Sequence, residues 1–384
     1  MEKTSNKALS FVRTYTLSAQ TPLIHFQYEQ PGATLRATEV KPKLDKFLKE
    51  KAKKDGADLS GCFVGDTDAL DYKMRIVSDG KARIVSLGFK DENGQKTEYD
   101  IYYGNMGNNS QKKKGVSGNA KITIACLKSG LLEFIDKYIG EFFAVTNFGT
   151  MSNKGFGSFI VSEKKLSEAQ VSVALKERYG ASRCYCINSQ GTHFKQIKVI
   201  YSILKSGVNF HGYQRSLLFL FMHNEYDYGN EKAWLKQQRI APALGRNADQ
   251  HDKVSYFVRA LLGVGERIEF LNDLNNRRDK VVVTISDSNK QIERLPSPII
   301  FKVIGNSIYM VANRIDENIY GKTFTFESKM GKGTLKVPTK AELGEDFIDK
   351  FLAFAVGEFQ KGIADKFVSS DNDNRNSRII IKEV

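Results

Sequence analysis

The segment from Leu23 to Leu48 constrains this chain most, because it combines an apolar stretch, a Pro-Gly turn and a lysine-rich helical pattern. Pro42 suits the first position of a helix, where the missing N–H of proline costs nothing. Apolar residues then follow at positions 44, 47 and 48, with lysines mostly on the opposite side. The segment therefore predicts a strand, a turn and a basic helix start of about three turns, which together can grip a phosphate backbone.

The length and composition indicate a folded, soluble protein. A chain of 384 residues is long enough for about two domains, each with its own core. The longest apolar run, LLFLFM at residues 217–222, is too short to cross a bilayer. The first residues carry no secretory signal pattern, so we expect a cytoplasmic protein with no membrane partner.

The charge balance favours a polyanionic partner. Lysine and arginine total 58 against 44 acidic residues, which gives a net charge of +14. Such an excess in a soluble protein favours nucleic acid, while a generally basic surface without a ligand is the alternative.

The first half of the chain reads as strand, helix, strands, helix, strand, and this order is that of a ferredoxin-like split unit. We expect it to close near residue 165. The expected elements are a strand at Phe11–Ile24, two strands at 72–89 around an Asp79-Gly80 hairpin turn, strands at 97–103 and 121–127 around a loop at 104–119, a helix at Leu131–Val145, and a final strand after a glycine-rich loop.

The second half can be read in the same way, although no sequence repeat is visible. The expected elements are a strand at Phe194–Leu204, a helix at Lys253–Leu262, strands at 280–286, 299–304 and 307–312, a helix at Leu343–Phe359 and a strand at Arg378–Lys382. An insertion around 205–250 mixes aromatic and basic residues, among them Trp234, and is either an RNA-facing element or an ordinary surface subdomain. The predicted class is α+β, with tandem ferredoxin-like (RRM-like) βαββαβ domains at 1–165 and 166–384.

The glycine-rich segment at 149–157 is a candidate phosphate site. Gly149, Gly155 and Gly157 let backbone N–H groups approach phosphate oxygens, and Lys154 adds a positive charge. A turn between a helix and a strand also needs glycine, so the pattern supports either interpretation. The segment is not a P-loop, because it precedes a strand and lacks the GK[ST] ending.

Three local patterns carry a family resemblance. They are Thr21-Pro22-Leu23 followed by LRATEVKPKLDKFL, the glycine-rich FGTMSNKGFGSF, and YFVRALLGVG with SPIIFKV in the second half. In their order and spacing the chain resembles the RAMP superfamily of CRISPR-associated RNA-binding proteins, most closely the first-subunit family of the Cmr (type III-B) effector complexes.

The resemblance implies a tandem ferredoxin-like, non-catalytic subunit of a type III effector complex in antiviral defence. Its partners would be CRISPR guide RNA, target RNA or their duplex, together with the other effector subunits. The residues that match the family's RNA contacts are Arg36, Lys41, Lys43, Lys154, Gly155, Gly157 and Arg259. Lys112, Lys113 and Lys114 join them only because a lysine cluster in a loop can neutralise phosphates, although such clusters are more often solvated.

The rival function is a metal-independent endoribonuclease that processes CRISPR RNA. Some RAMP relatives use a histidine as general base on the 2′-hydroxyl, and here His25 lies close to Tyr28 and precedes Lys41. A histidine at the end of an apolar strand is more often a hydrogen-bonded structural residue, which we favour.

A metal site has little support from the sequence. Asp66, Asp68 and Asp71 match no calcium loop and are better explained as a polar turn. Cys184 and Cys186 could act with His193, but tetrahedral zinc needs a fourth ligand. We expect no metal or cofactor, and four buried free thiols.

Overall fold

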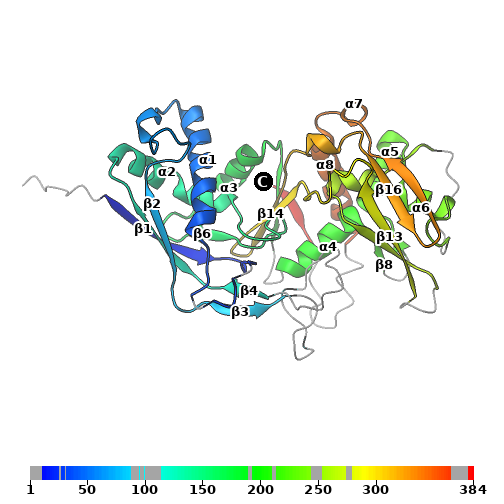
Figure 1. Ribbon diagram of the computed structural model, residues 1–384, viewed down its shortest axis with the longest axis horizontal. Helices are drawn as coiled ribbons and strands as arrows, with labels where there is room; N and C mark the ends of the chain where they lie inside the picture. Colours follow the sequence, from blue (N-terminus) through cyan, green and yellow to red (C-terminus); the bar gives the residue numbers. More distant parts are fainter. Residues whose placement is uncertain are drawn as a thin grey trace, which may run out of the picture.

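The computed structural model describes residues 11–25, 27–30, 32–87, 95, 99, 114–188, 193–209, 213–243, 253–273, 279–364 and 379–384. The fold is α+β, with helices packed on several small antiparallel sheets. The two halves of the chain lie side by side along the longest axis (Figure 1). None of the described helices is long and apolar enough to cross a membrane.

The first sheet is built from strands β1 (Val12–Ala19), β2 (Lys73–Ser78), β5 (Ala120–Ala125) and β6 (Phe159–Val161). Its order is β2-β5-β1-β6, and every neighbouring pair is antiparallel. The burial of β1 alternates, with Tyr15 and Leu17 in the core and Thr14 and Thr16 exposed. Helices α1 (Ala37–Asp55) and α2 (Ser129–Val145) share this core with the strands.

Three predictions for the first half were wrong in detail. Helix α1 begins at Ala37 and has 19 residues, so Pro42 lies inside the helix and not at its first position. Strand β2 does not form a hairpin with β3 (Arg83–Ser86), since β2 pairs with β5 and β3 pairs with β4 (Lys114–Ser117). The strand β4 also occupies part of the expected loop at 104–119. The expected strand at 97–103 lies largely outside the described residues.

The second sheet contains β7 (Cys184–Asn188), β14 (Ile299–Ile304), β15 (Ser307–Ala312) and β18 (Ile381–Glu383). Its order is β14-β15-β7-β18, again antiparallel throughout. Helices α4 (His193–Lys205) and α8 (Phe347–Gln360) contribute to the core on this side. Helix α3 (Glu168–Tyr179) contacts α2 of the first half and strands β7 and β15 of the second.

Two predictions for the second half were wrong. Residues 194–204 form helix α4, because the buried residues Phe194, Ile197, Ile200, Tyr201 and Leu204 recur at helical spacing, although their β-branched and aromatic side chains favour strands. Residues 253–262 form strand β11 (Ser255–Tyr256) and a 3₁₀-helix at Val258–Leu262, not an α-helix. The predicted strands at 280–286, 299–304 and 307–312 are confirmed.

A third antiparallel sheet belongs to a unit inserted between α4 and α8. It runs β12-β13-β16-β17, from β12 (Arg267–Leu271), β13 (Lys280–Asp287), β16 (Thr323–Ser328) and β17 (Gly331–Lys336). Trp234 packs edge-on against Phe326 at 6.0 Å and so contributes to the packing of this unit. The remaining short elements are β8 (Val208–Asn209), β9 (Tyr213–Gln214), β10 (Gly229–Asn230), α5 (Leu217–Tyr226), α6 (Glu231–Gln237), α7 (Lys340–Leu343) and 3₁₀-helices at Ser60–Cys62 and Glu317–Ile319.

A buried lysine joins the two halves. Lys302 on β14 is 1% exposed, and its ammonium donates to the carbonyl oxygens of Phe143 at 2.8 Å, Thr146 at 2.9 Å and Phe159 at 3.3 Å. The first two acceptors lie at the C-terminal end of α2, where carbonyls lack helical partners and the helix dipole favours a cation. Burial holds the pKa of Lys302 well below its ordinary value.

The substitution Lys302→Met is expected to destabilise the protein by about 1–3 kcal/mol at neutral pH, because buried carbonyls lose a donor. Because its pKa is depressed, Lys302 binds more protons in the unfolded chain than in the folded protein up to about pH 10, so its own contribution to stability should rise with pH in the alkaline range. The Lys302→Met variant should lose this pH-dependent contribution to stability. Urea denaturation at pH 7 and pH 9.5 tests both points, with the exposed Lys329→Met as control; equal stability of Lys302→Met and Lys329→Met would contradict the assigned role.

Candidate nucleic-acid interface

The segment 147–158, here called the glycine loop, is bonded to both halves of the chain. The N–H of Gly157 donates to the carbonyl of Pro22 at 2.8 Å, and that of Thr150 donates to Ile24 at 2.9 Å. On the other side the N–H of Phe301 in β14 donates to the carbonyl of Asn153 at 2.9 Å. The glycine loop therefore lies at the junction between the first and second sheets.

The glycines of this loop are required by close backbone packing. Gly149 has φ +73°, and a Cβ there would lie 2.5 Å from the carbonyl oxygen of Ile24. Gly157 has φ +65°, and a Cβ there would lie 1.9 Å from the carbonyl oxygen of Phe148. The N–H groups of Gly149, Gly155 and Gly157 all donate to acceptors within the protein. A phosphate near this loop would therefore be held mainly by side chains.

The start of α1 contacts the glycine loop directly. Glu39 accepts a hydrogen bond from the N–H of Gly149 at 2.8 Å and also pairs with Lys43 at 2.9 Å. The Lys43 ammonium lies 4.9 Å from the ring centre of Phe148, and the Lys43 side chain is 39% exposed. Arg36, at the N-cap of α1, donates to the side chain of Gln27 at 3.2 Å. Lys43 thus contacts the loop from the side of the first half, whereas Arg36 contacts the segment after β1.

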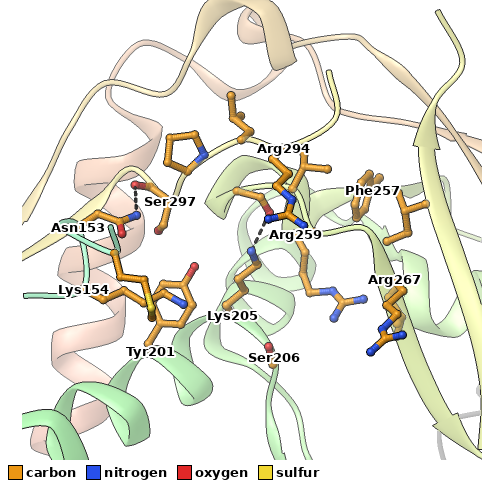
Figure 2. Close-up of a pocket in the computed structure, with 18 residues that line it drawn as sticks. Asn153, Lys154, Tyr201, Lys205, Ser206, Phe257, Arg259, Arg267, Arg294 and Ser297 are labelled. Carbon is orange, nitrogen blue, oxygen red and sulfur yellow. Dashed lines mark hydrogen bonds between the residues drawn. The ribbon is translucent and has the colours of Figure 1, made fainter. Parts of the chain in front are cut away.

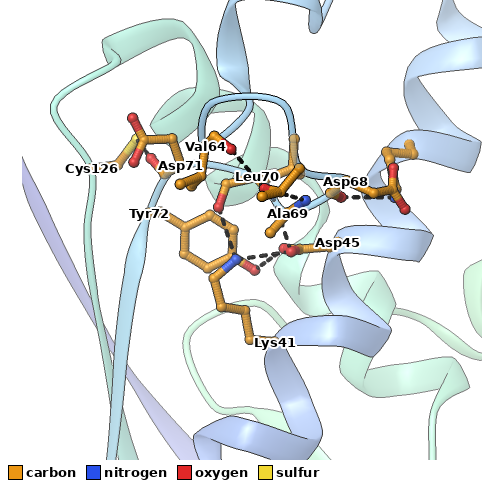
Figure 3. A network of polar contacts seen from close by, with 11 residues as sticks. Lys41, Asp45, Val64, Asp68, Ala69, Leu70, Asp71, Tyr72 and Cys126 are labelled. Carbon is orange, nitrogen blue, oxygen red and sulfur yellow. Dashed lines mark hydrogen bonds and ion pairs between the residues drawn. The ribbon is translucent and has the colours of Figure 1, made fainter.

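Lys41 serves a buried network, shown in Figure 3. Its ammonium pairs with Asp45 at 2.8 Å, donates to the carbonyl of Leu70 at 2.8 Å and lies 4.1 Å from the ring centre of Tyr72. Asp45 is buried and also accepts from the Tyr72 hydroxyl at 2.6 Å. Lys41 therefore neutralises a buried carboxylate four positions along the same helix.

A pocket of about 430 Å³ lies between the glycine loop, α4 and the segments 257–268 and 294–297 (Figure 2). Among the described residues that line it, none is acidic. We call it the cationic pocket, because five of its lining residues are Lys154, Lys205, Arg259, Arg267 and Arg294.

The cations of the pocket differ in how they are compensated. Arg259 pairs with the fully buried Glu231, and Arg294 donates to Glu266 at 2.7 Å. Lys205 donates to the backbone carbonyls of residues 262 and 263 at 3.0 and 2.6 Å. Burial, together with the nearby charges of Arg259 and Lys154, lowers the pKa of Lys205 to about 7. Arg267 also pairs with Glu269 at 3.7 Å, so the pocket is partly desolvated and its positive charge is offset in part by carboxylates outside its lining.

The structure brings together only some of the residues selected from the sequence. Lys154 and Arg259 line the same pocket, although one comes from the glycine loop and the other from the inserted unit. Lys114 lies in strand β4, whereas Lys112 and Lys113 fall outside the described residues.

Other lining residues were missed by the sequence analysis. Tyr201 and Lys205 lie four positions apart in the helix that was taken for a strand, so a helical reading would have placed them on one face. No sequence motif marks Arg267 or Arg294 as a binding residue, because the residues around each are ordinary for a strand or a turn.

Two members of the predicted trio, His25 and Lys41, have hydrogen-bond partners of their own. The His25 Nδ1 accepts a hydrogen bond from the N–H of Gln27 at 3.2 Å, which leaves the ring proton on Nε2 when the imidazole is neutral. Burial and the charge of Arg36 lower the His25 pKa and favour that neutral form. The ammonium of Lys41 is held by Asp45 and Leu70.

The acidic and cysteine residues have structural partners. Asp68 pairs with Lys49 at 2.5 Å, and Asp71 pairs with Lys128 at 3.2 Å. Cys126, Cys184 and Cys186 are buried free thiols, whereas Cys62 is partly exposed. His193 contacts the carbonyl of Gly305 at 2.9 Å. Within the described part of the chain, no group of three or more histidine, cysteine or acidic side chains is placed to hold a metal ion.

Comparison with known families covers nearly the whole chain. Residues 11–208 match the model of the Cmr1 N-terminal domain, and residues 213–378 match that of the Cmr1 C-terminal domain. No curated protein sequence matches the chain significantly. The two matches occur in the expected order and together include the glycine loop and the cationic pocket. This chain therefore belongs to the Cmr1 family, whose members are subunits of the type III-B Cmr complex of CRISPR systems.

Proposed function

We propose that this protein is a non-catalytic RNA-binding subunit of a type III CRISPR effector complex. It contacts the backbone of guide RNA, or of the guide–target duplex, alongside the other effector subunits. The observation that carries the proposal is the meeting of Lys154 from the glycine loop with Arg259 and three further cations in one pocket that has no acidic lining among the described residues. Phosphate contacts by lysine and arginine are the main source of RNA affinity.

A tandem ferredoxin-like architecture is part of the proposal. Its support is the strand order, which is β2-β5-β1-β6 in the first sheet and β14-β15-β7-β18 in the second. In each sheet the chain runs strand, helix, strand, strand, helix, strand if the inserted elements are set aside. The exposed positions of β1 and β5 in the middle of the first sheet carry Val12, Thr14, Thr16 and Lys121, so bases would find no aromatic platform there. Side-chain contacts to phosphates fit this surface better than base stacking.

The absence of catalysis is likewise proposed on chemical grounds. A general base needs a free lone pair aimed at the 2′-hydroxyl, and the neutral His25 uses the Nδ1 lone pair for the Gln27 N–H. The Nε2 atom is buried, which further restricts access by RNA.

The double variant Lys154→Gln/Arg294→Gln is expected to weaken RNA binding and to flatten its salt dependence. Each lost phosphate contact should reduce the log–log salt slope by about 0.7 on single-stranded RNA. Fluorescence anisotropy at several salt concentrations measures both quantities. The matched control is Lys165→Gln/Lys329→Gln, which removes two charges from exposed positions outside the pocket. An unchanged slope in the pocket variant would remove the basis of the proposal.

The substitution Lys41→Gln is expected to act on stability, not on RNA contacts. Without the ammonium, the buried Asp45 loses its counter-ion, and the protein should be destabilised by about 1–3 kcal/mol. Thermal denaturation measures this loss. If Lys41→Gln keeps the wild-type stability but lowers the salt slope of RNA binding, Lys41 contacts RNA and its structural role is secondary.

The purified protein is expected to leave RNA intact in EDTA. Labelled repeat-containing RNA, incubated with the wild-type protein and resolved on a denaturing gel, tests this point. His25→Ala should bind RNA as the wild type does. Cleavage by the wild type that is lost in His25→Ala would establish the ribonuclease function instead.

A further inference from the structure

Three half-buried cationic side chains at the cationic pocket share one acidic neighbour. Lys205 on α4, Lys232 on α6 and Arg259 lie near one another, and Glu231 is the acidic residue that acts on all three. Lys232 donates to the carbonyl of Ser206 at 2.9 Å, and its pKa is lowered to about 7 by burial and by Arg259. Burying several cations around one carboxylate costs free energy, so this arrangement is expected where an anion completes the site.

Part of the hydrogen-bonding capacity of the site is unused. Arg259 donates to Glu231 through Nε, whereas its buried Nη2 has no hydrogen-bond partner among the described residues. The buried Oε2 of Glu231 also has no hydrogen-bond partner among the described residues. The Nε and Nη2 atoms of a guanidinium form one fork, so Nη2 can pair with Oε2 in a two-bond contact with Glu231 that holds Arg259 in the wall of the pocket.

The remaining walls of the pocket are apolar. Met151 comes from the glycine loop, Val264 and Ile268 follow the 3₁₀-helix, and Leu295 and Pro296 precede β14. A volume of about 430 Å³ suits a small ligand that combines a charged group with a flat apolar body. Figure 2 shows Lys154 beside Tyr201 on one side of the pocket and Arg267 on the other.

We propose that the cationic pocket binds a terminal nucleotide through its phosphate monoester. A monoester carries a second negative charge that an internal phosphodiester lacks, and five lining cations can match it. The end of an RNA chain can also enter a closed pocket, whereas an internal phosphodiester needs openings on two sides so that the RNA can continue past it. The ligand is a phosphorylated RNA end or a free nucleotide, since both present the same chemistry. The RNA form of this inference depends on the proposed function.

Binding of such a dianion is coupled to proton uptake. The charged groups that face Lys205 are Lys154 from the glycine loop, Arg259 from the 3₁₀-helix and Glu231 from α6. A bound dianion favours the ammonium form and raises the Lys205 pKa from about 7, so affinity should fall as the pH rises above 7. The second pKa of a phosphate monoester is about 6, so affinity should also fall below that value. The optimum is expected between about pH 6 and 7.

The test compares three short RNAs of one sequence with the full-length protein. One carries a 3′-phosphate, one a 5′-phosphate and one hydroxyl groups at both ends. One phosphorylated RNA should bind about tenfold more tightly than the hydroxyl RNA at pH 6.5, the effect of roughly one charge-assisted hydrogen bond. Fluorescence anisotropy from pH 5.5 to 8.5 gives the pH profile. Competition by the free nucleoside monophosphate distinguishes a nucleotide ligand from an RNA end.

The variant Lys205→Gln should abolish the phosphate preference and the decline above pH 7, and Lys329→Gln should retain both. If Lys205→Gln fails to fold, Arg294→Gln, whose side chain is 67% exposed, tests the preference in its place. Equal affinity of the wild type for all three RNAs, with loss of binding in Lys154→Gln/Arg294→Gln, would overturn this inference and leave the proposed function intact. No binding of any RNA at any pH would overturn both.

Discussion

The contact between Lys302 and the end of α2 is the interaction on which the arrangement of the two halves depends. A single ammonium from the second sheet satisfies carbonyl groups at the C-terminal end of a helix in the first half. The site is buried, so water cannot replace that donor. Because β14 is held there, the neighbouring Phe301 can accept and donate hydrogen bonds with the glycine loop.

The glycine loop consequently has a structural role that does not depend on any role in binding. Its glycines allow backbone contacts with the segment after β1, and Asn153 connects it to β14. This fixed position presents Lys154 at the rim of a pocket whose other cations come from the inserted unit. The half-buried lysines there have lowered pKa values, which is a cost to stability and is typical of sites built for a ligand.

The predictability of the fold varied between elements for physical reasons. The class, the two long helices of the first half and the strands at 280–312 could be predicted, because their apolar periodicity is local. Helix α4 was predicted as a strand, since its isoleucines and its tyrosine are common in strands. Helix α3 was overlooked although Ser167 and Gln170 form a capping box that the sequence displays. The pairing of β3 with β4 could not be predicted from local sequence patterns, because tertiary packing decides which strands pair when they lie far apart in the chain.

The residues of the candidate site also differ in how far the sequence could predict their roles. By itself the sequence determined the basic character of the protein, the glycine loop and the family resemblance, because composition and short motifs are properties of neighbouring residues. Only the tertiary structure decided that Lys41 neutralises Asp45 while Lys154 lies in a pocket with Arg259. The physical reason is that the role of a lysine depends on which charges and how much water surround it, and residues distant in the chain supply that environment.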